Sequence, residues 1–153
     1  MKAVVQRVTD ASVTAGGVVK GGVKAGLLVY LGVAHEDSEK DSLWLAEKIV
    51  NLRIFNDSQG IMNLSLKDVV VNEPSAGVLV ISQFTLLADA RKGRRPSWHG
   101  AAAPEKAKEL YEHFISKIRE YGLICECGEF QAHMKVSYTN DGPVTILLDS
   151  TER

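Results

Sequence analysis

Three runs of hydrophobic positions near the start of the sequence have the spacing of β-strands. Residues 2–8 and 11–19 mix apolar and β-branched residues with polar positions in a pattern that predicts two paired strands. Residues 26–33 form an almost wholly apolar run that begins and nearly ends with glycine. This run predicts a buried strand, so the three segments would begin a sheet.

Two later segments have the spacing of amphipathic helices. The first begins at Ser38, where Ser-Glu-Lys-Asp resembles a capping box, and places Leu45, Ile49 and Leu52 on one side. The second runs from Pro104 to just before Gly122, about five turns. Its apolar side carries Ala107, Leu110, Tyr111, Phe114, Ile118 and Tyr121. We expect both helices to pack on the sheet.

Strand-like segments return at residues 124–130, 134–138 and 144–148. Strands therefore dominate both ends of the chain and do not alternate regularly with helices. This order predicts an α+β fold: a mainly antiparallel, curved sheet or partial barrel covered by two helices. The 153 residues contain no linker or repeat, so we expect a single domain spanning 1–153.

The composition is that of a globular protein, with 45% hydrophobic residues and a formal net charge of -1. No apolar run is long enough to cross a bilayer, and the first residues lack the pattern of a targeting segment. We therefore expect a cytoplasmic protein with no membrane partner.

The cysteines and histidines do not predict a disulfide or a metal site. Cys125 and Cys127 would lie on one face of a strand about 6.6 Å apart, near the upper limit for a disulfide. The histidines at 35, 99, 113 and 133 lack the spacing of metal ligands. We expect two reduced thiols and no metal or other cofactor.

A local concentration of positive charge occurs at residues 91–95, where Arg91, Lys92, Arg94 and Arg95 surround one glycine. Such a segment is either a solvated basic loop or a surface that neutralises nucleic-acid phosphates. Charge alone favours the solvated loop.

The segment Ser82-Gln83-Phe84-Thr85 directly follows the apolar run at 77–81. A hydroxyl nucleophile needs a base, and no His, Asp or Glu accompanies Ser82 or Thr85 here. Taken alone, the segment is typical of a strand end that faces solvent. A strand end also offers backbone N–H groups and a side-chain amide, which are the groups that stabilise an oxyanion.

The segment Asn140-Asp141-Gly142-Pro143 combines a hairpin signal with a proline that donates no hydrogen bond. It is therefore not an ordinary two-residue turn that leads into a fully paired strand. A trans proline in a surface turn is the default, and a special Gly-Pro geometry is the alternative.

Several motifs together, in order over nearly the whole chain, resemble the D-aminoacyl-tRNA deacylases. They are AVVQRV followed by ASVT, LRIF followed by MNLS, then SQFTL, KGRRPSW and NDGPVT. The resemblance implies a homodimeric esterase that removes D-amino acids from the 3′-terminal adenosine of tRNA, and also glycine mischarged on the alanine tRNA. It further implies that the 2′-hydroxyl of that adenosine assists catalysis, or alternatively that the threonine of SQFTL is the nucleophile.

The resemblance also assigns residues to the site. Ser82, Gln83, Phe84 and Thr85 would line the catalytic pocket, and the backbone N–H groups near Phe84 and Thr85 would stabilise the oxyanion. Gly142 and Pro143, joined by a cis peptide and preceded by Asn140, would reach in from the other subunit, held by Arg7. Phe130 and Met134 match the positions that hold the terminal adenine, although from the sequence alone they are core residues. Arg91, Lys92, Arg94 and Arg95 would contact tRNA.

Three positions depart from the family pattern. Gln131 stands where the family usually has glycine, His133 where an acidic residue is common, and Ile61 where lysine often precedes Met-Asn. They bear on contacts with the adenosine or acceptor stem more than on the reaction. Two alternatives stay open: a tRNA-binding accessory module without turnover, and a general ester or peptide hydrolase that uses Thr85 or Ser82.

Overall fold

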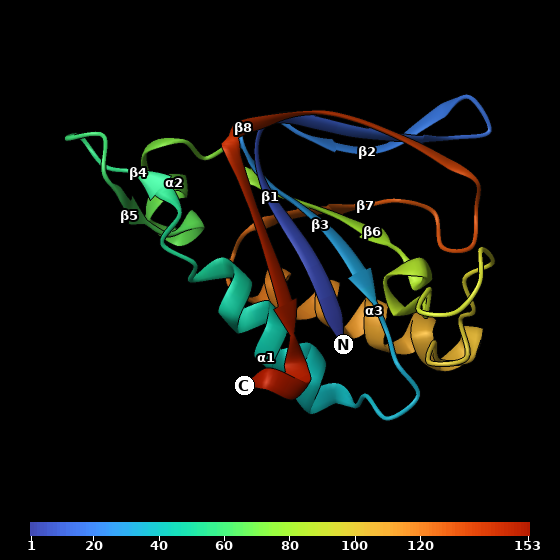
Figure 1. Ribbon diagram of the computed structural model, residues 1–153. Helices are drawn as coiled ribbons and strands as arrows, with labels where there is room; N and C mark the ends of the chain where they lie inside the picture. Colours follow the sequence, from blue (N-terminus) through green and yellow to red (C-terminus); the bar gives the residue numbers. More distant parts are fainter.

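The computed structural model describes residues 1–153 and consists of a strongly curved sheet with helices on one of its faces (Figure 1). The elements follow one another as β1 (Lys2–Ala15), β2 (Val18–Val23), β3 (Gly26–Gly32), α1 (Glu39–Val50), β4 (Phe55–Asn56), β5 (Met62–Leu64), α2 (Leu66–Asn72), β6 (Gly77–Ser82), the 3-10 helix η1 (Phe84–Leu87), α3 (Pro104–Glu120), β7 (Ile124–Cys127), β8 (Met134–Asp149) and the 3-10 helix η2 (Ser150–Glu152).

The six-stranded sheet has the order β2-β1-β3-β6-β7, with β8 paired to β1, and β4 and β5 form a separate hairpin. The fold class α+β is confirmed, and the sheet is mixed: three of its strand pairings are antiparallel and two are parallel. Strand β1 pairs antiparallel with β2, β3 and β8, whereas β3–β6 and β6–β7 are parallel. Parallel neighbours require crossover connections, and α1 with α2, and then α3, make them. The prediction that strands and helices do not alternate was therefore wrong for this half of the sheet.

Two pairs of predicted strands are each one continuous strand. Residues 2–8 and the first part of 11–19 form β1, which passes exposed Thr9 and Asp10 at a shift in its register with β8. Residues 134–138 and 144–148 likewise both belong to β8. A bulge lets a strand continue past residues that do not fit the ladder, which is why the polar interruptions were taken for strand ends.

The sheet curls until β2 lies against β7. At Gly21 a Cβ atom would stand 2.7 Å from the carbonyl oxygen of Cys127, so only glycine permits this approach. Between β3 and β6, Gly26 has φ +142, and a Cβ there would stand 1.9 Å from the carbonyl oxygen of Gly77. The expected partial barrel is thus nearly closed.

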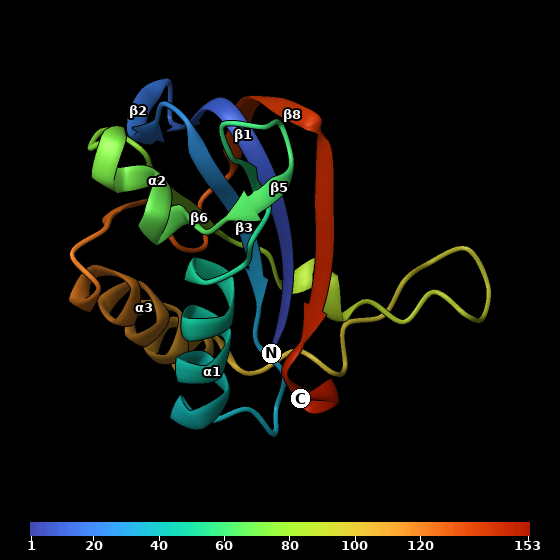
Figure 2. The ribbon, with the colours of Figure 1, turned by 90° about the vertical axis from the view of Figure 1, so that its left-hand side faces the viewer.

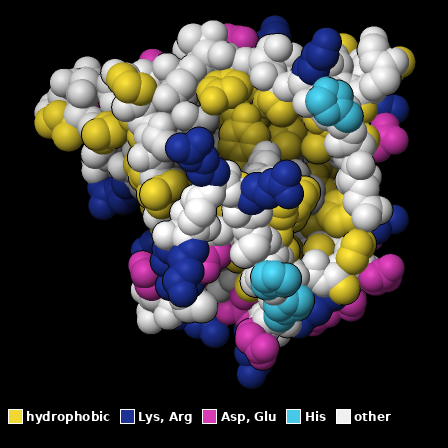
Figure 3. All heavy atoms as spheres, turned by 45° about the vertical axis from the view of Figure 1, so that its right-hand side comes forward, with side chains coloured by type: hydrophobic (Ala, Val, Ile, Leu, Met, Phe, Trp, Pro, Cys, Tyr) yellow, Lys and Arg dark blue, Asp and Glu magenta, His cyan; other side chains and the backbone are white.

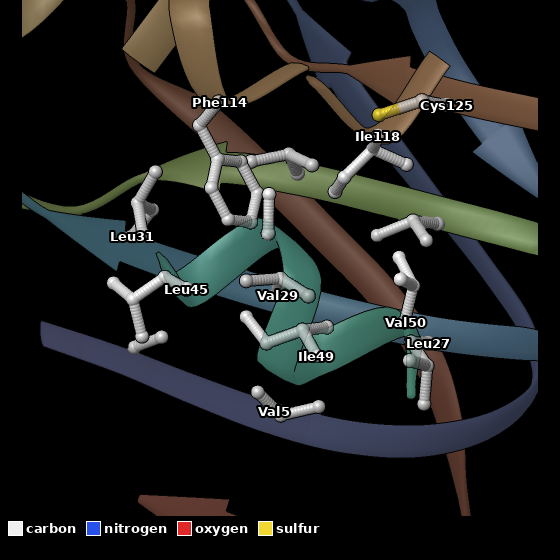
Figure 4. Close-up of a cluster of buried hydrophobic side chains, with 14 of the residues drawn as sticks. Val5, Leu27, Val29, Leu31, Leu45, Ile49, Val50, Phe114, Ile118 and Cys125 are labelled. Carbon is white, nitrogen blue, oxygen red and sulfur yellow. The ribbon is translucent and has the colours of Figure 1, made fainter. Parts of the chain in front are cut away.

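The main core lies between the sheet and helices α1 and α3 (Figure 4). Leu27, Val29 and Leu31 point from β3 toward Leu45 and Ile49 of α1. Phe114 of α3 is fully buried among them, and burying one such side chain stabilises the fold by about 1.5–3 kcal/mol. Of the side chains predicted to face the sheet, Leu52 is half-buried against this core and Tyr121 is exposed.

Both predicted helices are confirmed, and a third was missed. In α1 the Ser38 backbone N–H donates to Oδ2 of Asp41 at 2.9 Å, which completes the capping box. The same arrangement joins Ser65 and Asp68 at the start of α2, where the N–H to carboxylate distance is 2.8 Å. The Ser-x-x-Asp signal of α2 was therefore present in the sequence. None of the helices has the length and apolar character that crossing a membrane requires.

The other face of the sheet carries no α-helix. In Figure 2 helices α1, α2 and α3 lie on one side, β8 crosses the opposite side, and the loop between η1 and α3 projects beyond it. Ile146 and Leu148 of β8 pack against the core, so the intervening Leu147 points away and is 76% exposed. An apolar side chain this exposed on an uncovered sheet marks a candidate contact surface.

Candidate active site

The segment after β6 leaves the sheet through a single turn of 3-10 helix. The Gln83 N–H still donates to the Leu31 carbonyl at 2.8 Å, which continues the pairing with β3. The chain then turns, and the Leu86 N–H donates to the Gln83 carbonyl at 3.2 Å. The N–H groups of Phe84 and Thr85 precede this first bond, so the helical ladder gives them no acceptor. The turn thus presents two backbone donors beside a strand end.

A cavity of about 590 Å³ opens next to this strand end. Figure 3 shows the hollow, with a hydrophobic floor and with cationic and histidine side chains at its edge. Its lining residues come from β3, the β6 end, the start of α3 and the connection before β8: Leu31, Val33, Ile81, Ser82, Gln83, Phe84, Ala101, Ala102, Pro104, Ala107, Phe130, Gln131, Ala132, His133, Met134 and Val136. Its lining includes no carboxylate and no lysine or arginine.

Of the predicted residues, Ser82, Gln83 and Phe84 line the cavity and Thr85 does not, and neither hydroxyl is hydrogen-bonded to a carboxylate or a histidine. Gln83 Nε2 donates a hydrogen bond to the Thr85 hydroxyl, and Ser82 is half-buried in the wall. His99, the histidine nearest in sequence, does not line the cavity, and its carbonyl contacts the His35 ring at 2.5 Å. The arrangement supplies hydrogen-bond donors and orientation rather than proton abstraction.

Phe130 and Met134 lie both at the cavity and against the core. Both line the cavity, and Phe130 is also packed against the core, with its ring centroid 5.8 Å from that of Tyr111. Burial beside the two thiols raises the pKa of Tyr111, whose hydroxyl donates to the Val80 carbonyl at 2.8 Å. Tyr111 therefore supports Phe130 on the side away from the cavity.

Of the three positions that depart from the family pattern, two lie at the cavity. Gln131 and His133 line it and are exposed, whereas Ile61 lies on the β4–β5 hairpin and does not. Gln131 has φ 63, the left-handed region that L residues seldom adopt.

The Gly142-Pro143 segment is an outward bulge of β8. Gln6 of β1 pairs with Thr145 and Val8 pairs with Asn140, so Asp141 to Val144 lie opposite Arg7 alone. The peptide bond between Gly142 and Pro143 is cis, and both residues are exposed. None of the bulge residues lines the cavity of its own chain.

The side chains of Asn140 and Arg7 hold the bulge in place. Asn140 Nδ2 donates to the carbonyls of Arg7 and Val144, each at 3.0 Å. Arg7 is buried, its Nη1 donates to the Ile54 carbonyl at 2.7 Å, and its Nε lies 2.8 Å from a carboxylate oxygen of Asp141. That Nε makes an ion pair without a well-directed hydrogen bond. Arg7 therefore links the bulge to the chain just before β4.

The basic segment lies in the exposed loop between η1 and α3 (Figure 2). Arg91 is engaged with Asp89, with Nη2 to Oδ2 at 2.7 Å, and its hydrogen bonds hold the pKa of the Asp89 carboxyl well below its usual range. Lys92, Arg94 and Arg95 make no ion pair within the chain. Their charges are free for an anionic partner.

Several residues near the cavity were not predicted from the sequence. Trp98 packs edge-on against Phe84 with ring centroids 5.7 Å apart. Ala101, Ala102 and Pro104 line the wall where the loop enters α3. The Trp98 contact depends on a loop that folds back over η1, and no periodic pattern predicts such a path.

Neither the thiols nor the acidic and histidine side chains form a reactive cluster. Cys125 and Cys127 are both free, and burial raises the pKa of Cys125 to about 12, so its thiol is inert. No group of three His, Cys, Asp or Glu side chains is placed to hold a metal ion.

Comparisons with known proteins show the family to which the chain is similar. The family model described as D-Tyr-tRNA(Tyr) deacylase matches residues 4–149. A D-aminoacyl-tRNA deacylase of Thermosipho melanesiensis is 56% identical over 98% of this chain and 97% of its own length. A D-aminoacyl-tRNA deacylase of Koribacter versatilis is 57% identical with the same coverage of both chains.

Solved structures of similar fold extend the comparison. One described as a c-Myc DNA Unwinding Element Binding Protein is 40% identical, with a TM-score of 0.87, over 97% of this chain and 98% of that chain. Another, described as a probable eukaryotic D-amino acid tRNA deacylase, shares the fold at 16% identity, with a TM-score of 0.79, over 96% of this chain and 97% of that one. Matching motifs, fold and near-complete coverage lead to one conclusion: the chain belongs to the D-Tyr-tRNA(Tyr) deacylase family of ester hydrolases.

Proposed function

We propose that this protein acts as one domain that hydrolyses the ester of D-aminoacyl-tRNA and of glycyl-tRNA mischarged on the alanine tRNA, releasing the free amino acid. The observation that carries the proposal is the cavity beside Ser82–Thr85, which presents backbone donors and contains no carboxylate. An ester that carries a hydroxyl group on the adjacent carbon can react in such a site. That hydroxyl assists the attack on the ester, so no base from the protein is needed. The 3′-terminal ribose of tRNA provides this hydroxyl at its 2′ position.

The chemistry then divides between enzyme and substrate. The 2′-hydroxyl assists the attack of water on the ester carbonyl, and the N–H groups of Phe84 and Thr85 stabilise the negative charge that develops on the carbonyl oxygen. The Thr85 hydroxyl, held by Gln83, orients the ester. The bond between the acyl carbon and the 3′-oxygen breaks, and the proton that the attacking water loses passes by way of the 2′-hydroxyl to the 3′-oxygen, which leaves the free amino acid and a 3′-hydroxyl. The terminal base lies against Phe130 and Met134, whose apolar surfaces suit a flat ring.

Chirality is selected by exclusion. With the ester carbonyl and the ribose fixed, and the α-amino group held by carbonyl oxygens of Gly142 and Pro143, the fourth substituent of Cα has one direction left. A D side chain points outward, an L side chain meets the Gly-Pro backbone, and glycine has no side chain to exclude. A backbone anchored by Arg7 and Asn140 suits this role better than a mobile side chain.

This role requires a homodimer, because Gly142 and Pro143 do not line the cavity of their own chain. The face of the sheet without α-helices is the surface that would meet the partner, since Leu147 and Tyr138 of β8 are exposed. A two-fold arrangement would bring the bulge of each chain to the cavity of the other.

The experiment that tests the proposed activity is deacylation of one tRNA charged with a D-amino acid, with its L enantiomer or with glycine. We expect turnover of the D and glycyl esters and little above the spontaneous rate for the L ester. Equal cleavage of D and L esters would contradict the exclusion mechanism, and no cleavage of any would leave a binding module without turnover. Cleavage of simple D-amino acid methyl esters at the same rate would favour the general hydrolase.

Replacing Leu147 with lysine tests the dimer. A charge at the centre of an apolar contact costs several kcal/mol to bury, so the variant should be monomeric and lose deacylation. Sedimentation and turnover measured at the same concentration check both results. Val71→Lys is a matched control, since Val71 is also 76% exposed but lies on α2, on the helical side, and should leave both unchanged. An active monomer would contradict the cross-subunit site.

Replacing Arg94 and Arg95 together with glutamine tests the tRNA surface. Each lost phosphate contact should raise KM at physiological salt and reduce the salt dependence of log KM by about 1, with kcat nearly unchanged. Lys48→Gln, an exposed charge on α1, provides the control. An unchanged salt dependence of log KM would show that residues 91–95 are a solvated basic loop that does not contact tRNA.

A further inference from the structure

The backbone of Gln131 is in the left-handed region, which is energetically unfavourable for a residue with a side chain. Gln131 is the only non-glycine residue with positive φ, at 63°. It occupies the third position of a turn that the Ala132 N–H closes on the Glu129 carbonyl at 3.2 Å. Glycine or asparagine is preferred there, because a longer L side chain crowds its own backbone. A glutamine in this conformation at the rim of a cavity points to a function of the side chain.

The turn around Gln131 is fixed on both sides. Glu129 forms an ion pair with Lys20 at 2.8 Å, which ties the turn to β2. Phe130 packs on Tyr111, and the Gly128 N–H donates to the Val80 carbonyl at 3.1 Å. The left-handed conformation therefore belongs to an anchored turn and holds the Gln131 side chain at the rim.

The Gln131 side-chain amide has a hydrogen-bond donor and an acceptor that are both available to a ligand. It makes no hydrogen bond within the protein, whereas the other amide of the cavity, that of Gln83, is engaged by Thr85. The residues on either side of it, Phe130 and Ala132, present apolar surface to the cavity. A flat base lying on Phe130 would leave its polar edge directed at the rim.

We propose that Gln131 determines base specificity by pairing its amide with the edge of adenine. A glutamine amide matches adenine in two bonds, its oxygen accepting from the 6-amino group and its Nε2 donating to a ring nitrogen. The inference rests on the proposed function, in which the 3′-terminal adenosine occupies this cavity. Purine without the 6-amino group keeps the ring and the stacking surface but loses one of the two bonds.

The test uses two non-hydrolysable ligands, 3′-deoxy-3′-(D-alanylamino)adenosine and its purine riboside counterpart, with Kd measured by calorimetry. The wild type should bind the adenosine compound about 5- to 10-fold more tightly, at the lower end for one paired base edge. Gln131→Gly should bind both equally, no more tightly than the wild type binds the purine compound, and should melt about 2–4 °C higher because it suits the positive φ. Gln131→Asn keeps an amide and tolerates the backbone but is one methylene shorter, so it should also lose the preference.

Equal binding of the two ligands by the wild type, or an unchanged preference in Gln131→Gly, would overturn the inference while leaving D-aminoacyl-tRNA hydrolysis intact. If the wild type neither hydrolyses D-aminoacyl-tRNA nor binds either compound, the proposed function fails and the inference fails with it. The melting temperature shows in each case that the variant is folded.

Discussion

A tRNA whose terminal adenosine lacks the 2′-hydroxyl, with a D-amino acid on its 3′-oxygen, should be hydrolysed by this protein at least about 10³-fold more slowly than the normal substrate. The cavity contains no carboxylate, and neither the Ser82 nor the Thr85 hydroxyl is hydrogen-bonded to a histidine, with His133 exposed at the rim, so we expect the substrate to supply the group that assists attack. Removing that group leaves only positioning and charge stabilisation. Single-turnover deacylation, corrected for the spontaneous hydrolysis of each ester, measures the ratio.

Thr85→Ala provides the matched comparison on the protein side. It should lose about 10²–10³-fold in kcat, the loss of one oriented contact, and not the roughly 10⁶-fold loss that follows removal of a covalent nucleophile. If the deoxy substrate is cleaved normally while Thr85→Ala is inactive and the wild type accumulates an acyl-enzyme, Thr85 is the nucleophile.

Gly142→Ala should lower kcat/KM for D-aminoacyl-tRNA by about 10²-fold and also reduce the preference for D over L. At this position φ is +114, and a Cβ would stand 2.9 Å from Cγ2 and 3.1 Å from the backbone nitrogen of Val144. Because a backbone atom is in the way, the Gly-Pro segment must move, and a displacement of about 1 Å at a reacting group has an effect of this size.

Gly60→Ala is the control that measures how much stability is lost when alanine is placed at a positive φ without a steric clash. Gly60 also has positive φ, at +78, but a Cβ there has no neighbour within 4 Å. Gly60→Ala should therefore lose only the stability that the positive φ costs, and Gly142→Ala at least as much, measured by urea unfolding, while only Gly142→Ala loses activity. Equal activity in both would show that the bulge has no part in the site.

The sequence predicted individual elements better than their connections. Helix α1 starts with the capping box expected at Ser38, because capping is a local interaction. The parallel pairing of β3 with β6 was missed because it depends on two glycines, Gly26 and Gly77, that lie far apart in the chain and allow close approach. Helix α2 was missed although Ser65 and Asp68 carry the same signal as α1, because its apolar stripe is only two turns long.

The candidate site divides in the same way. The sequence placed Ser82–Thr85 at a strand end, and the structure has a strand end and a turn there. Trp98 was not foreseen, because its contact with Phe84 depends on how a long loop folds back. Glutamine itself does not predict the positive φ of Gln131, and the one sign of it in the sequence is that the family usually has glycine at this position. The cytoplasmic location stays a prediction.

The most direct test of the account is complementation between two damaged subunits. Thr85→Ala damages the cavity, and Gly142→Ala damages the bulge. In a heterodimer of the two, purified through two different affinity tags, one site combines both lesions and the other combines an intact cavity with the partner's intact bulge. A cross-subunit site predicts that the heterodimer regains about half of the wild-type rate on D-aminoacyl-tRNA, because one of its two sites is complete. A heterodimer no more active than the two variant homodimers would show that cavity and bulge act within one chain, and would contradict the account.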